Sequence, residues 1–118
     1  MNTALWIVQG LLAFAFFAAG AMKATQPLEK LAVNMAWVKT TPAPLVRFIG
    51  IAEIAGAIGL IAPMALGILP ILTPVAAVCL VVVMVLAVAT HVRLNEIALS
   101  VPSIVLGALA AFVAWGRF

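Results

Sequence analysis

Four long apolar runs, separated by short connections, dominate the pattern of hydrophobic and polar positions. The runs cover about residues 3–22, 45–62, 74–90 and 97–115. At about 1.5 Å per residue, a helix of about 20 residues crosses the roughly 30 Å hydrocarbon core of a bilayer. The pattern therefore predicts four membrane-spanning helices. The second run is slightly short, and we expect its helix to continue past Pro63 with a kink.

The connection between the first two runs has a different pattern, in which apolar side chains recur at helical spacing among polar ones. The recurring apolar residues are Leu28, Leu31, Met35 and Val38. Pro27 suits a first helical turn, and Trp37 is of the type that anchors among lipid headgroups. We therefore predict a short amphipathic helix at about residues 27–39, lying at the membrane interface. An ordinary polar loop is the alternative.

The composition narrows the fold class further. Of the 118 residues, 68% are hydrophobic and 8% are charged, whereas a soluble domain is nearer half apolar and a quarter charged. A chain of this size cannot bury so much apolar surface in water. We predict an all-α, integral membrane four-helix bundle, with the interfacial helix between spans one and two, forming one domain over residues 1–118.

The charges are few and uneven. A net charge of +3 from scattered Lys and Arg residues gives no dense basic face, so nucleic-acid binding is not expected. The basic residues of the first and third connections and their flanks are Lys23, Lys30, Lys39, Arg47 and Arg93. The positive-inside rule therefore predicts a multi-pass membrane protein with these connections cytoplasmic and both termini outside.

The ionisable residues of the spans gather toward one end of the predicted bundle. Lys23 ends the first span, Arg47 begins the second, and His91 and Arg93 close the third. Glu53 lies six residues beyond Arg47, which places it about 9 Å deeper along the helix axis. These five residues are our candidates for ligand binding.

The helical neighbours of Glu53 indicate its direction. Gly50, Gly56 and Ala57 share its face, and small residues let spans pack closely. A carboxylate that faces lipid would also be unfavourable. We therefore expect Glu53 to point inward, toward cations of neighbouring spans. The residues assigned to helix packing are Gly20, Gly50, Gly56 and Gly59.

Two hypotheses for this cluster remain open. It is either a buried ion pair that fixes helix register or a polar pocket that binds a headgroup, a quinone ring or a proton. No metal site is expected, because too few donors cluster, and no nucleophile has a base beside it, so no catalytic residue is assigned. The single cysteine, Cys79, excludes an intrachain disulfide, and we expect it to be a small buried residue.

The motifs together resemble those of the DoxX-like family of small four-span bacterial membrane proteins. They are Gly20-Ala-Met-Lys23, a proline-rich bend before Arg47, the run RFIGIAEIAGAIGLIAP that contains Glu53, and a third span that ends in His91-Val-Arg93. The resemblance implies a four-helix membrane bundle in the bacterial inner (cytoplasmic) membrane. Relatives in that family are similar to a subunit of a thiosulfate:quinone oxidoreductase or join membrane redox complexes in oxidative stress, and a distant animal relative is an assembly chaperone.

The leading functional hypothesis is an accessory subunit of a membrane redox or stress-response complex, not catalytic alone, with a quinone or lipid pocket around Glu53. We expect no covalently bound cofactor, quinone as the candidate ligand, and the bilayer, other membrane proteins or further copies of the chain as partners. Two alternatives are an assembly or interaction module, which the small-residue stripes suit, and a minimal proton-coupled transporter built around Glu53.

Overall fold

The computed structural model describes residues 2–34, 38–39, 41–95 and 97–118. Within these ranges the chain is helical and contains no strand. The helices are α1 (Asn2–Thr25), α2 (Leu28–Asn34), α3 (Ala43–Leu66), α4 (Leu72–Arg93) and α5 (Ile97–Arg117). Among the described residues, four helices (α1, α3, α4 and α5) are long and apolar enough to cross a membrane. The predicted all-α four-helix membrane bundle is therefore confirmed.

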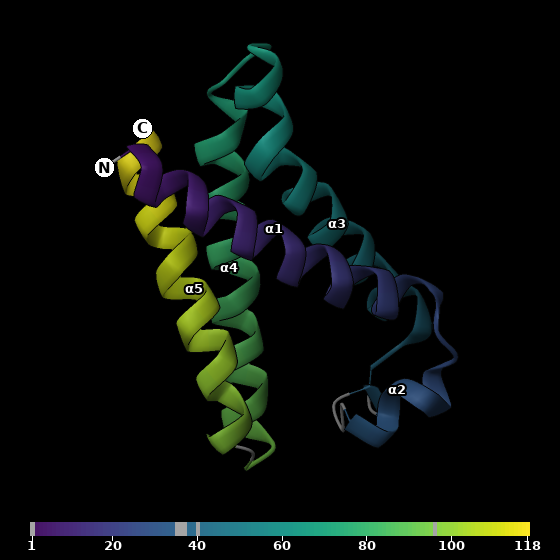
Figure 1. Ribbon diagram of the computed structural model, residues 1–118. Coiled ribbons are helices and arrows are strands. Elements are labelled where there is room, and N and C mark those ends of the chain that lie inside the picture. The colour runs from purple at the N-terminus through teal and green to yellow at the C-terminus, as the bar shows by residue number, and fades with distance from the viewer. Residues whose placement is uncertain (1, 35–37, 40, 96) are drawn as a thin grey trace.

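The spans form two closely packed antiparallel pairs, α1 with α3 and α4 with α5. Figure 1 shows α4 and α5 side by side, with α1 running obliquely across the bundle and the two termini together at one end. Helices α3 and α4 are close at the connection between them and spread apart toward the end where α2 lies (Figure 1). This divergence leaves space inside the bundle at that end.

Glycines set the close approaches between the spans. A Cβ atom built on Gly20 would lie 2.5 Å from the backbone oxygen of Gly50, so the backbones of α1 and α3 are in direct contact at this crossing. On α3, a Cβ at Gly56 would lie 2.7 Å from Leu80 of α4, and one at Gly59 would lie 2.8 Å from Ala76. All four glycines that the sequence assigned to packing thus lie at helix–helix contacts.

The helix ends follow from backbone chemistry. Helix α3 continues past Pro63 to Leu66, and Gly67 follows it in the left-handed conformation, with φ of 68°. Glycine adopts this conformation without a Cβ clash, which makes it a common helix C-cap. The hydroxyl of Thr73, near the start of α4, donates to the Gly59 carbonyl of α3 at 2.9 Å. This bond links α3 to α4 near the connection between them, where the two helices lie close together.

The short helix α2 packs on its apolar side. Leu31 forms a small cluster with Val38 and Val46, the last of these at the start of α3. The predicted interfacial helix of residues 27–39 therefore begins as expected, and its helical part is described to Asn34. Met35 and the proposed anchor Trp37 lie outside the described residues, and the location of α2 at a membrane interface stays a prediction.

The outward faces of the spans are apolar. Large aliphatic and aromatic side chains of all four spans are exposed, whereas a core of Leu, Ala, Val, Met and Phe side chains fills the centre. This arrangement suits a protein whose solvent is hydrocarbon. The prediction that Cys79 is buried is wrong, because the structure exposes it on α4. Its side chain points away from the Leu80 face, which packs against α3.

Candidate functional site

Lys23 of α1 and Glu53 of α3 form a buried ion pair. The Lys23 Nζ atom lies 2.6 Å from Glu53 Oε1 and donates a hydrogen bond to it. The Glu53 side chain is 1% exposed and that of Lys23 is 13% exposed. A carboxylate this deep requires a partner, since an unpaired charge in a low-dielectric interior is strongly unfavourable.

Antiparallel packing and side-chain direction together produce this pair. Each residue lies one turn beyond the glycine of its own helix at the crossing, Lys23 after Gly20 and Glu53 after Gly50. Helical side chains tilt toward the N-terminus of their helix. Because α1 and α3 run in opposite directions, the two tilts are opposed and carry the side chains toward each other. The glycine crossing therefore determines which cation reaches Glu53.

Arg47 takes a different partner. Its Nη1 atom donates to the backbone oxygen of Lys23 at 2.8 Å, near the end of α1, where carbonyl groups lack N–H donors within the helix. A cation at a helix C-terminus also interacts favourably with the helix dipole. Arg47 thus fastens the start of α3 to the end of α1, and it is not among the residues that line the cavity described next.

A cavity of about 640 Å³ lies between the diverging spans. All four spans contribute to its wall, and its surface is mostly apolar, with side chains such as Phe16, Ile49, Ala87 and Leu106. The polar side chains of the wall are Lys23, Thr41, Glu53, Thr90, His91, Arg93 and, on α5, Ser103. Its size and its few convergent polar groups are typical of a small-molecule site.

Four of the five candidate ligand-binding residues therefore line one cavity. Lys23 and Glu53 are joined directly, and His91 and Arg93 approach from α4. Arg47 is the residue that the structure places elsewhere. Together, the cavity residues could hold a molecule with an apolar body and a carbonyl or anionic group, because ammonium, imidazole and guanidinium groups donate hydrogen bonds.

A second buried polar cluster lies near the opposite end of the bundle and was missed by the sequence analysis. Gln9, fully buried on α1, donates from Nε2 to the Leu60 carbonyl of α3 at 2.6 Å and accepts from Arg117 Nε at 2.7 Å. Arg117 also donates to Asn2 Oδ1 at 2.7 Å and lies over the ring of Trp6. The sequence feature that could have predicted this cluster is Gln9 itself, a single glutamine inside the first apolar run.

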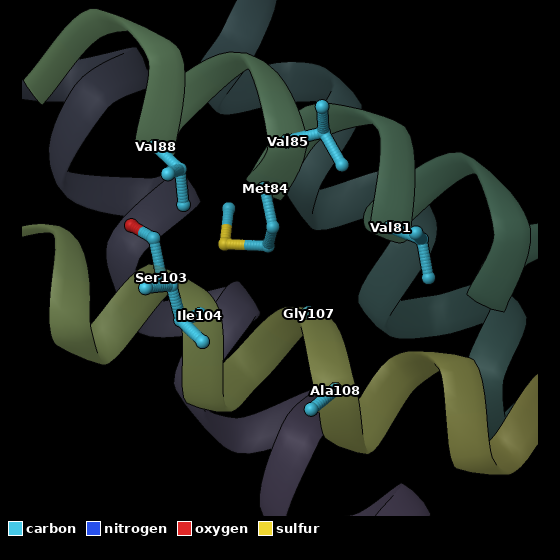
Figure 2. Close-up of a pocket in the computed structure, with 8 residues that line it drawn as sticks. All are labelled: Val81, Met84, Val85, Val88, Ser103, Ile104, Gly107 and Ala108. Carbon is cyan, nitrogen blue, oxygen red and sulfur yellow. The ribbon is translucent and has the colours of Figure 1, made fainter. Parts of the chain in front are cut away.

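A smaller hollow of about 270 Å³ lies on the outer side of the α4–α5 seam. Figure 2 shows Val81, Val85 and Val88 on α4 facing Ile104 and Ala108 on α5. The side chain of Met84 lies between the two helices and lines both this hollow and the larger cavity.

The described residues contain no group of three or more His, Cys, Asp or Glu side chains placed to hold a metal ion. Around Glu53 the described residues supply hydrogen-bond donors and charge pairing, from the ammonium of Lys23 and the imidazole of His91.

A family model described as the DoxX-like family matches residues 7–113. This range contains the ion pair, the cavity and all four glycines at the helix contacts. Searches of curated proteins and of solved structures found no match.

Proposed function

The chain belongs to the DoxX-like family, and from this premise we propose that it binds the headgroup of a membrane quinone. In this proposal it acts as an accessory subunit of a membrane redox system and is not catalytic alone. The supporting observation is the cavity between the spans, which is apolar over most of its wall and lined at one end by the Lys23–Glu53 pair and His91.

A quinone suits the two parts of this wall. Its flat ring is largely apolar and can pack against aliphatic and aromatic side chains. Its carbonyl oxygens accept hydrogen bonds, and both the ammonium of Lys23 and the imidazole of His91 carry N–H donors. Glu53 holds the Lys23 side chain inside the bundle, whereas a lysine near a helix end would otherwise extend toward the membrane surface.

The location of the ion pair also supports the proposal. A pair needed only for helix register could be replaced by apolar side chains without loss of stability. Here the pair forms part of a cavity wall, together with His91, whose imidazole carries an N–H donor. In the proposed role these residues bind and orient the quinone, and a partner redox protein exchanges electrons with it.

The test is ligand binding by protein reconstituted in lipid nanodiscs. Native mass spectrometry would measure the fraction of protein that carries a short-chain benzoquinone, for the unchanged protein and for Glu53→Gln. Glu29→Gln is the matched control, since Glu29 is exposed on α2 and is outside the cavity wall. We expect saturable binding that falls at least about tenfold in Glu53→Gln and is unchanged in Glu29→Gln.

Other outcomes would favour the alternative functions. Purification in mild detergent of a stable complex with another membrane protein, without quinone, would favour the assembly module. Proton-coupled uptake into vesicles that Glu53→Gln abolishes would favour the transporter. Equal quinone binding by Glu53→Gln and Glu29→Gln would contradict the proposed site.

A further inference from the structure

Two of the residues that line the cavity are also strongly exposed on the outside of the bundle. Phe48 of α3 is 66% exposed and Leu86 of α4 is 62% exposed. A side chain that forms part of a cavity wall and is mostly accessible from outside lies at the edge of an opening. Leu45 of α3, which is also exposed, lines the same cavity. Arg93, at the end of α4, and Pro102 of α5 also line the cavity and are exposed. The apolar part of the cavity edge, formed by Phe48, Leu45 and Leu86, lies between α3 and α4.

The packing of these two helices explains why the opening is there. Gly56 and Gly59 hold α3 against Leu80 and Ala76 of α4 on the side near their connection. Beyond that contact the helices spread apart (Figure 1), and Phe48 and Leu86 lie in the spreading part. The glycine contacts between α3 and α4 therefore determine where the two helices separate and where the edge of the opening lies.

The side chains at the edge of the opening are apolar. Phe48, Leu45 and Leu86 carry no polar side-chain atom, and the neighbouring outward residues Ile51 and Val82 are apolar and exposed. In a chain with four membrane-spanning helices, such a surface faces acyl chains rather than water. A ligand that passes this edge comes from the bilayer.

The hollow on the α4–α5 seam is the competing route, and Met84 and Ser103 line both this hollow and the cavity. Met84 lies between it and the cavity, and this residue is 5% exposed. Opposite it, a Cβ atom on Gly107 would lie 3.2 Å from Met84 Cβ, so the two helices are in close contact there. Figure 2 shows the Met84 side chain lying between the two helices.

We infer that the cavity is loaded laterally from the bilayer through the opening between α3 and α4, and that the hydrocarbon tail of the bound molecule leaves through the same opening, across Phe48 and Leu86. This inference rests on the proposed function. It defines the ligand class as a membrane amphiphile with one carbonyl-bearing head and a long hydrocarbon tail. The head lies beside Lys23 and Glu53, and the tail lies among the lipids.

The first test maps the tail. A benzoquinone with a ten-carbon tail that ends in a photoreactive diazirine is bound to the protein in nanodiscs, irradiated, and the labelled residues are identified by mass spectrometry. We expect labels near Phe48 and Leu86, suppressed by excess unlabelled quinone. Labels at Ile104 or Ala108, in the α4–α5 hollow, would overturn the lateral opening while leaving quinone binding intact. Absence of saturable binding by the probe would refute the proposed function itself.

The second test blocks the opening. Leu86→Trp places a bulky ring at the edge, and Val82→Trp places the same ring one turn earlier on α4, on an exposed face outside the cavity wall. We expect Leu86→Trp to slow the association of both the tailed quinone and a tail-less benzoquinone at least about tenfold. Val82→Trp should leave both rates unchanged. Equal rates in the two variants would show that the ligand uses another route.

Discussion

The crossing of α1 and α3 at Gly20 and Gly50 yields a sharp prediction for Gly20→Ala. The added Cβ would lie 2.5 Å from the Gly50 oxygen, whereas ordinary contact begins at 3.4 Å, so the helices must separate by about 0.9 Å. The obstructing atom belongs to the backbone and cannot rotate away. Forcing one methyl group into a closely packed contact destabilises a protein by about 1–3 kcal/mol.

Gly10→Ala is the matched control in the same helix. A Cβ at Gly10 would meet no atom within 4 Å, so this variant keeps the gain of up to about 1 kcal/mol in helix propensity without the clash. Unfolding in mixed micelles, followed by the loss of helical circular dichroism as the fraction of dodecyl sulfate rises, would measure both. We expect Gly20→Ala to be about 1–3 kcal/mol less stable than Gly10→Ala. Equal stability would refute the backbone contact as the feature that positions Lys23 beside Glu53.

Three further predictions concern charge, polarity and lipid exposure. Lys23→Met and Glu53→Leu should each lower the free energy of unfolding by about 3–5 kcal/mol, whereas the double variant recovers most of the loss; additive losses in the same micelle assay would show that the two residues are not coupled. Gln9→Leu should lose about 1–3 kcal/mol because the Leu60 carbonyl loses its side-chain donor, and unchanged stability would contradict the importance of that cluster. A nitroxide on Cys79, the single cysteine, should be relaxed more by oxygen than by a water-soluble nickel complex in electron paramagnetic resonance; the reverse order would show that this face of α4 is not in lipid.

The spans could be predicted from the sequence because they depend on local properties. The length of each apolar run, with a fixed rise per residue, determines whether a helix can cross the bilayer. Helix α3 extends beyond the predicted run of residues 45–62 at both ends, to Ala43 and Leu66. A backbone in hydrocarbon must satisfy its own hydrogen bonds, so the helix continues past Pro63 although that residue lacks an N–H group.

The inward direction of Glu53 was also accessible from the sequence, since its face is made of small residues. The identity of its partner was not, because Lys23, Arg47, His91 and Arg93 were all within reach of the expected bundle end. The choice depends on the crossing point of two helices and on the opposed tilt of their side chains. Arg47 instead binds the Lys23 carbonyl, a contact that depends on the path of the connection between α1 and α3.

Contacts between distant parts of the chain were the least predictable. Gln9 and Arg117 are 108 residues apart and meet only because the start of α1 and the end of α5 lie at the same end of the bundle (Figure 1). The cavity likewise depends on how far α3 diverges from α4, which no single run of residues determines. Cys79 was misplaced because an almost wholly apolar helix has too little polarity to indicate which face is inward.

The most direct test of the account is a crystal structure of the protein grown from a lipidic mesophase with a tailed benzoquinone. The account predicts ring density in the cavity between Glu53 and His91, with a carbonyl oxygen within hydrogen-bonding distance of Lys23 or His91. A cavity without ring density at saturating quinone, or a Glu53 carboxylate that faces lipid, would contradict it.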